Sequence, residues 1–372
     1  ALSNSKAAQR CLRPCGGVMA VTGGDAADGV SLRTRGPLPG ADEWSHPFAN
    51  PGRTSATRDK HVRLPLKMLW FGGPGPARMV DRHRIPPISV YANGRLYVPA
   101  ENYVIGMDAY NGREMWAHEL KGVGRFPGND RGASVVADDD SVYAPHGATC
   151  VRLDGDTGKV LQTYKPPETQ FPKKPGPAVK PKQKGKKGRG LLFNEVEWNY
   201  LAVTNKAVFG TVGEARISRS MANWPRSTPN GRLLFALDKK SGKTLWTFKP
   251  KHAVAPKAIV LDEKRVYLLD QQNSSGKIGE SVLRALDIRN GKPVWSKPVR
   301  ERWELLLSND FVVAAGSGYS VFDVESGKEQ WSNTIPFGSY DEYGVGIDHY
   351  QWAVALRDFP VIPPMIVNNT IV

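Results

Sequence analysis

Five short apolar runs along the chain each end at an aspartate, and a glycine follows each of these aspartates four residues later. The clearest copy has the apolar run 233–237, the polar stretch 238–242 and the mixed run 244–248. The apolar run predicts a buried strand, the aspartate can accept backbone N–H groups of a turn, and the glycine suits the left-handed position that ends a hairpin loop. Each copy therefore predicts a β-hairpin. The five copies are Asp108 with Gly112, Asp154 with Gly158, Asp238 with Gly242, Asp287 with Gly291 and Asp323 with Gly327.

Most copies carry two further features that extend the hairpin. Another apolar run precedes the hairpin, at 95–98, 141–144, 265–269 and 311–314. A tryptophan follows the glycine by four residues in four copies, as Trp116, Trp246, Trp295 and Trp331, whereas the second copy has Gln162 there. Each copy thus predicts an antiparallel sheet of about four strands, which buries both faces only when it packs radially against further copies, as in a β-propeller. We expect the tryptophans to wedge between neighbouring sheets.

The amino-acid sequence of the repeat indicates one kind of propeller. The segments LLFALDKKSGKTLW at 233–246, VLRALDIRNGKPVW at 282–295 and YSVFDVESGKEQW at 319–331 resemble the PQQ-type repeat of quinoprotein-dehydrogenase-like propellers. The Gly-His and Trp-Asp pairs of WD40 blades and the Gly-Gly pair of kelch blades do not recur. The resemblance implies an all-β fold, a β-propeller of four-stranded antiparallel blades with about five to six blades visible and an incomplete ring.

Both ends of the chain suggest that further sequence belongs to the fold. Segment 362–372 is similar to 85–98, which predicts the opening of another blade. Segment 66–70 resembles the last strand of a blade, with Trp70 but without a preceding hairpin. Because the first strand of a closed propeller often completes its last blade, we expect a missing C-terminal part to supply the other strands of that blade.

The N-terminal segment predicts a different unit. Residues 8–21, AQRCLRPCGGVMAV, resemble a segment of class I SAM-dependent methyltransferases, with a helix that ends at Leu12, a turn, and a buried strand from 18 to 21. Residues 35–46 resemble the junction of bacterial proteins that fuse such a domain to a PQQ-like propeller. These resemblances imply three parts: a remnant of a methyltransferase-like domain at 1–36, a linker leading into the propeller at 37–65, and a partial PQQ-like propeller at 66–372, with a basic insertion at 166–190. The SAM-binding glycine loop belongs to earlier strands, so we expect no methyl transfer by the remnant itself.

Charge adds one feature to this picture. The formal net charge is +15, and eight lysines or arginines, with no acid, lie between 172 and 189. Proline, glycine and lysine at this density cannot bury apolar surface, which predicts a disordered or extended loop. This loop is either a solvated insertion or a contact with an anionic lipid, polysaccharide or nucleic acid. Nucleic acid is the least favoured, because no aromatic residues interleave the lysines. No run reaches the length of a membrane span.

The sequence contains no legible catalytic motif. The seven histidines form no zinc motif, and neither a Gly-x-Ser-x-Gly elbow nor a Walker loop is present. Similar dehydrogenases carry an adjacent cysteine pair, a calcium ion beside the quinone and often a Cys-x-x-Cys-His haem motif, whereas Cys11, Cys15 and Cys150 form neither cysteine motif. The acidic run 138–140 fits a calcium loop or a plain turn, and we favour the turn. We predict no catalytic residue and no metal site.

Propeller geometry places any binding pocket at a mouth of the central channel, where polar loop residues gather. The richest segment is 195–200, which mixes carboxylates with aromatic residues, although its aromatic side chains could instead cover a blade edge. The candidate ligand-binding residues are Glu101, Asn102, Arg131, His146, Glu195, Glu197, Trp198, Tyr200, Arg216, Gln271 and Gln272.

Three functions remain open at this point. The favoured hypothesis is a non-catalytic binding or scaffold propeller of the bacterial periplasm or cell envelope, resembling the propeller lipoprotein of the outer-membrane assembly machine. Its partner would be a protein or an anionic envelope component, and no cofactor is expected. The first alternative is a PQQ-dependent alcohol or sugar dehydrogenase with PQQ and calcium in the channel. The second alternative is a substrate-recruiting domain of a SAM-dependent methyltransferase.

Overall fold

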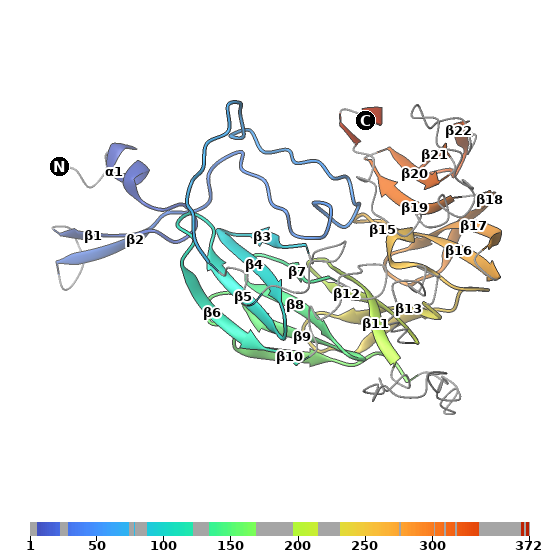
Figure 1. The fold of residues 1–372 in the computed structure, drawn as a ribbon, viewed down its shortest axis with the longest axis horizontal. Helices are drawn as coiled ribbons and strands as arrows, with labels where there is room; N and C mark the ends of the chain where they lie inside the picture. The colour runs from blue at the N-terminus through green and yellow to red at the C-terminus, as the bar shows by residue number, and fades with distance from the viewer. Residues whose placement is uncertain are drawn as a thin grey trace, which may run out of the picture.

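Five four-stranded antiparallel sheets follow one another along the chain (Figure 1). The computed structural model describes residues 6–22, 29–73, 78, 88–121, 134–168, 196–214, 231–274, 277–300, 302–308, 310–316, 318–334, 366–367 and 370–371. Each sheet is a simple meander of four consecutive strands. The predicted fold class, a β-propeller of four-stranded blades, is therefore confirmed.

The blades are numbered here in chain order. Blade 1 consists of β3 Val90–Ala92, β4 Arg95–Ala100, β5 Tyr103–Asp108 and β6 Glu114–Glu119, and blade 2 of β7 Val136–Ala137, β8 Ser141–His146, β9 Thr149–Asp154 and β10 Val160–Tyr164. Blade 3 consists of β11 Val196–Val203, β12 Ala207–Glu214, β13 Leu233–Asp238 and β14 Thr244–Phe248. Blade 4 consists of β15 Ile259–Leu261, β16 Arg265–Ser274, β17 Lys277–Asp287 and β18 Pro293–Val299, and blade 5 of β19 Arg302–Leu307, β20 Phe311–Gly316, β21 Gly318–Asp323 and β22 Glu329–Ser332.

The predicted hairpins join the third and fourth strands of every blade. In blade 3 the N–H of Gly242 donates to the carbonyl of Asp238 at 2.8 Å, and the N–H of Ser241 donates to the Asp238 carboxylate at 2.7 Å. Gly242 has a φ of +70°, a left-handed conformation that a residue with a Cβ adopts only with strain. The aspartate and the glycine are therefore local turn residues, as the sequence predicted.

The tryptophans bind the hairpin of the following blade. In blade 3 the indole N–H of Trp246 donates to the carbonyl of Ile288 in blade 4 at 2.8 Å. Its ring packs so closely on Gly291 that a Cβ there would lie 2.5 Å from the ring. Trp116 repeats this contact on Gly155 and Gly158, and Trp295 repeats it on Val324 and Gly327. The predicted wedge is thus confirmed between blades 1 and 2, 3 and 4, and 4 and 5.

Blade 2, which lacks the tryptophan, reaches blade 3 with two other side chains. The hydroxyl of Tyr164 donates to the carbonyl of Lys239 at 2.7 Å. This carbonyl directly follows the aspartate of the repeat, so it corresponds to the carbonyl that a tryptophan contacts in the other blades. The amide of Gln162 lies against Gly242. Tyr164 and Gln162 together replace the missing indole.

The two outer edges of this series carry unmatched elements. Trp70 donates to the carbonyl of Ala109 at 2.8 Å and packs on Gly112, as a tryptophan from a preceding blade would. Contrary to the expectation, 66–70 forms no strand in the described structure, although its tryptophan takes the predicted place. At the other edge, Trp331 is 46% exposed. A separate two-stranded sheet pairs β23 Ile366–Val367 with β24 Thr370–Ile371.

The N-terminal unit is small and rests on blade 1. Helix α1, Lys6–Cys11, precedes a two-stranded sheet of β1 Val18–Thr22 and β2 Val30–Thr34. Arg13 forms a 2.7 Å ion pair with Asp108 of blade 1. The expectation of a buried strand at 18–21 was wrong, since Val18 is 55% exposed and only one residue of β1 is buried. Within the described residues β1 pairs with β2 alone, and every residue of β2 is exposed. The assignment of 1–36 to a methyltransferase-like domain stays a prediction.

Candidate functional site

A segment that the sequence did not single out runs across the centre of the propeller. We call residues 44–53 the crossing segment. The first strands of blades 1 and 2, of blades 2 and 3, and of blades 4 and 5 contact one another. The crossing segment bonds to the first strands of all five blades in chain order. The bonds run from Trp44 to Tyr91 of β3 at 3.0 Å, from Ala137 of β7 to Ser45 at 2.8 Å, from Val203 of β11 to His46 at 3.1 Å, from Leu261 of β15 to Pro51 at 3.2 Å and from Leu307 of β19 to Gly52 at 2.8 Å.

These bonds place the crossing segment at one end of the central channel. In blades 2 to 5 the bonded residue is the last residue of the first strand. In an antiparallel meander, that end of the blade also holds the hairpin between the third and fourth strands. The crossing segment therefore lies at the end of the channel that carries the Asp-Gly hairpins. The turns between second and third strands lie at the other end.

His46 fixes the middle of the crossing segment. Its Nε2 accepts the backbone N–H of Val203 at 3.1 Å, which leaves the ring proton on Nδ1, 2.9 Å from the hydroxyl of Ser45. The side chain is buried, and this desolvation lowers the pKa of His46 to about 3, against a smaller opposing effect of Asp138. His46 is therefore uncharged at neutral pH and holds the crossing segment to the backbone of β11.

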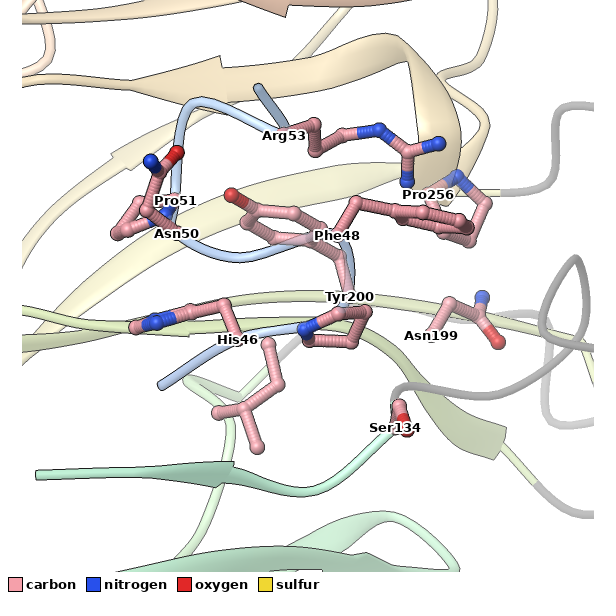
Figure 2. Close-up of a pocket in the computed structure, with 11 residues that line it drawn as sticks. His46, Phe48, Asn50, Pro51, Arg53, Ser134, Asn199, Tyr200 and Pro256 are labelled. Atoms are coloured by element: carbon pink, nitrogen blue, oxygen red, sulfur yellow. The ribbon is translucent and has the colours of Figure 1, made fainter. Parts of the chain in front are cut away.

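The crossing segment forms one side of a pocket of about 50 Å³ (Figure 2). Arg53 lies in this pocket, contacts the ring of Phe48 with its guanidinium 4.5 Å from the ring centroid, and forms an ion pair of 2.5 Å with Glu304 of β19. The charge of Arg53 is thus already matched by a carboxylate. The pocket is lined by His46, Pro47, Phe48, Asn50, Pro51, Arg53, Ser134, Asn199, Tyr200, Leu201 and Pro256.

A β-bulge in the first strand of blade 3 brings Asn199 to this pocket. Trp198 pairs with Val212 and Tyr200 pairs with Thr211, so Asn199 is the extra residue between them. The bulge sends Trp198 into the core shared with blade 2 and Tyr200 into the core shared with blade 4. The side chain of Asn199 points to neither core and lines the pocket (Figure 2). Bulges often redirect a side chain in this way near functional sites.

Asn199 has an unusual environment. It is 0% exposed, and neither its amide nitrogen nor its carbonyl oxygen has a hydrogen-bond partner among the described residues. Sequence reasoning named segment 195–200 but did not select Asn199. Trp198 and Tyr200 alternate with Glu197 and Asn199 as in an unbroken strand, so the sequence carries no signal of the bulge.

The predicted ligand-binding residues that the structure describes do not gather into one site. Tyr200 lines the pocket, whereas Trp198 is buried between blades. Gln271 is 1% exposed, and its amide donates to the hydroxyl of Ser281 and the carbonyl of Arg302, so it joins blades 4 and 5.

The remaining predicted residues lie on turns or outside the described residues. Glu101 and Asn102 form the turn between β4 and β5, and the ring of His146 bonds the carbonyl of Lys121 at 3.0 Å. Gln272 is exposed. Arg131, Glu195, Arg216 and residues 169–190 of the basic insertion lie outside the described residues, as does the side chain of Glu197.

The acidic run 138–140 forms a turn. The carboxylate of Asp138 accepts the N–H groups of Asp140 and Ser141 at 3.1 and 2.9 Å and the hydroxyl of Tyr143 at 2.8 Å. It also pairs with Lys239 of blade 3 at 2.7 Å. These contacts use both carboxylate oxygens and join blades 2 and 3, as expected of a structural turn.

The pocket beside the crossing segment does not fit PQQ, a flat tricyclic tricarboxylate. The pocket holds a few water molecules at most. Its one arginine is paired with Glu304, and its histidine is neutral. In the part of the chain that the structure describes, no group of three His, Cys, Asp or Glu residues could hold a metal ion. This pocket therefore lacks a free cationic partner for the carboxylates of such a cofactor.

Comparisons with known proteins agree on the fold. The sequence profile of a family described as outer membrane protein assembly factor BamB matches residues 229–335. The solved quinohemoprotein alcohol dehydrogenase ADHIIG from Pseudomonas putida HK5 is 14% identical with a TM-score of 0.52, over 79% of this chain and 48% of that chain. The chain folds as a β-propeller similar to that of this dehydrogenase.

Other comparisons set the limits of this likeness. The quinohemoprotein alcohol dehydrogenase from Comamonas testosteroni is 15% identical with a TM-score of 0.52, over 83% of this chain and 52% of that chain. This PQQ-like propeller thus spans about half the length of the dehydrogenases that it matches. BamB from Moraxella catarrhalis is 12% identical with a TM-score of 0.35, over 72% of this chain and 77% of that chain. No curated protein sequence matches the chain. Among the described residues, no helix is long and apolar enough to span a membrane.

Proposed function

We propose that this PQQ-like propeller is a non-catalytic binding module of the bacterial cell envelope that holds a protein partner. The observation that carries the proposal is the crossing segment, which bonds to the first strand of all five blades and occupies the channel end beside the hairpins. A channel that is filled in this way serves as a rigid platform. The match of residues 229–335 to an outer-membrane assembly factor family supports an envelope role.

A PQQ-dependent oxidoreductase is the alternative, favoured by the fold that the chain shares with quinohemoprotein alcohol dehydrogenases. The pocket opposes it, because its volume of about 50 Å³ and its internally paired arginine do not suit a tricarboxylate. A role as the recruiting domain of a methyltransferase has only the N-terminal resemblance behind it.

Site-directed photo-crosslinking in cells that produce the protein naturally would test the binding role. Glu101 lies on a turn at the channel end opposite the crossing segment, which we call the open end. A photoreactive residue at Glu101 should give a crosslink to a specific envelope protein. The same residue at Lys240, on the exposed hairpin of blade 3 at the other end, is the matched control. Equal crosslinking at both positions, or none at either, would contradict a partner held at the open end.

A further inference from the structure

Three exposed cations gather at the open end of blade 3. Arg232 directly precedes β13, and Lys249 and Lys251 lie on the connection that follows β14. The guanidinium of Arg232 donates to the carbonyl of His252 at 3.1 Å, so it lies beside the connection that carries the two lysines. We call Arg232, Lys249 and Lys251 the basic sector.

The core of blade 4 fixes the backbone of this connection. The carboxylate of Asp270 on β16 is 0% exposed and accepts the N–H groups of Lys251 and His252, each at 2.8 Å. One residue further, Ala253 forms a bridge with Gln271 of the same strand. The basic sector therefore keeps its backbone shape without a ligand.

Arg232 has hydrogen-bond donors that the described fold does not use. A guanidinium carries five N–H donors in one plane, and the bond to His252 is the one that this side chain makes among the described residues. Arg232 and Lys249 pair with no carboxylate in the same ranges. An arginine that is oriented in this way can bind a carboxylate through two parallel hydrogen bonds.

The carboxylates described at the open end of blades 3 to 5 do not balance this charge. Asp270 pairs with Arg284 at 3.1 Å, and Glu304 pairs with Arg53. Both carboxylates are thus matched within the fold. No exposed carboxylate that the structure describes at this end of these blades offsets the basic sector.

We propose that the basic sector binds an acidic segment of the protein partner at the open end, with Arg232 engaging a carboxylate. Hydrogen bonds between an arginine and a carboxylate contribute both energy and orientation. Lys249 and Lys251 lie two residues apart on a fixed connection and provide two further cations for neighbouring acidic residues. This inference rests on the proposed binding role and names the chemistry of its partner.

A polypeptide segment fits the basic sector better than an anionic membrane does. At the open end of blades 1 and 2 the described charged residues are mixed in sign, namely Glu101, Glu119, Lys121, Lys165 and Glu168. A flat anionic surface that met the whole end of the propeller would also meet these acids and be repelled by them. Cations that are confined to one side suit a short acidic segment.

Calorimetric titration of the purified full chain with a capped hexaglutamate peptide tests the inference. The double variant Arg232→Glu/Lys249→Glu should bind the peptide at least about tenfold more weakly than the natural sequence, a difference of one decade in Kd. Lys240→Glu/Lys243→Glu is the matched control, because it changes the net charge equally on exposed lysines at the hairpin end of the same blade. The control should weaken binding by less than about threefold.

Equal weakening in the two double variants would show a response to net charge alone and would overturn the proposal. Unchanged binding by Arg232→Glu/Lys249→Glu would place the peptide elsewhere and would also overturn it. Vesicles of phosphatidylglycerol and phosphatidylcholine test the membrane. If these vesicles bind more tightly than the peptide and Arg232→Glu/Lys249→Glu abolishes that binding, the sector serves a lipid surface and the polypeptide partner is wrong.

Arg232→Gln separates binding from folding. This variant retains an N–H donor for the carbonyl of His252, so it should weaken peptide binding at an unchanged melting temperature. A lowered melting temperature with unchanged affinity would show that Arg232 is structural. The titration needs no natural partner: a crosslink at Glu101 without peptide binding would refute the acidic segment alone, whereas peptide binding without a crosslink would contradict the proposed binding role.

Discussion

The contact between Trp246 and the hairpin of blade 4 yields the most quantitative prediction. Trp246 is 7% exposed and donates a 2.8 Å hydrogen bond to the carbonyl of Ile288. Trp246→Ala should lower the free energy of unfolding by about 3–5 kcal/mol, as for large aromatic residues in cores. Trp331 occupies the same position of the repeat but is 46% exposed. Trp331→Ala should therefore cost roughly half as much, about 2 kcal/mol.

The partner glycine gives an internal check on this contact. Gly291 has a φ of +69°, and a Cβ there would lie 2.5 Å from the ring of Trp246. Gly291→Ala should cost about 1–2 kcal/mol for the left-handed backbone and a further 1–3 kcal/mol for the clash. Gly147 has a φ of +58°, and no atom lies within 4 Å of an added Cβ. Gly147→Ala should therefore lower the free energy of unfolding only by the cost of the left-handed backbone, about 1–2 kcal/mol.

Urea unfolding followed by far-ultraviolet circular dichroism measures the free energy of unfolding of Trp246→Ala, Trp331→Ala, Gly291→Ala and Gly147→Ala. The same assay is applied to the double variant Trp246→Ala/Gly291→Ala. The alanine at position 291 no longer clashes once the indole of Trp246 is removed. The loss of unfolding free energy in the double variant should therefore be about 1–3 kcal/mol smaller than the sum of the losses in the two single variants. Additive losses, or equal losses for Trp246→Ala and Trp331→Ala, would refute the packing argument.

Three further predictions follow from buried polar groups. Because the pKa of His46 falls from 6.5 to about 3 on folding, the unfolded chain binds the extra proton below pH 6.5, and the free energy of unfolding should fall by about 2 kcal/mol from pH 7 to pH 5. In urea titrations His46→Gln should flatten this slope, and an unchanged slope would contradict the assignment. Tyr164→Phe should cost about 1 kcal/mol of unfolding free energy in the same assay, through loss of the hydrogen bond to Lys239, and no loss would contradict its role as a tryptophan substitute. Arg284→Met should cost about 3 kcal/mol because it removes the guanidinium that pairs with the buried carboxylate of Asp270, and a neutral effect would show that bonds such as those from the N–H groups of Lys251 and His252 suffice.

The blades were predictable from the sequence because their determinants are local. Asp238 and Gly242 act within one hairpin, and the apolar runs on either side have the length of strands. The role of Trp246 could also be inferred, since a large residue at one fixed position of each copy must meet the next copy. The exchange of a tryptophan for Tyr164 and Gln162 could not be inferred, because the hydroxyl of Tyr164 replaces the indole from a position two residues further along the strand.

The candidate site was less predictable because it depends on contacts between distant segments. The crossing segment has no periodic pattern, and its shape relies on left-handed conformations at residues other than glycine, such as Phe48 and Ala49 with φ of +63° and +84°. Local sequence preferences do not favour these conformations, so the surrounding blades must hold them. Asn199 became visible only through the bulge between Trp198 and Tyr200, which changes the face of the strand.

A titration of the protein with PQQ in the presence of Ca²⁺, followed by absorbance and melting temperature, tests the central claim most directly. A non-catalytic propeller with a channel closed by residues 44–53 predicts no saturable change in the PQQ spectrum and no rise in melting temperature. Saturable, calcium-dependent binding that raises the melting temperature would contradict the account and favour a quinone-dependent oxidoreductase.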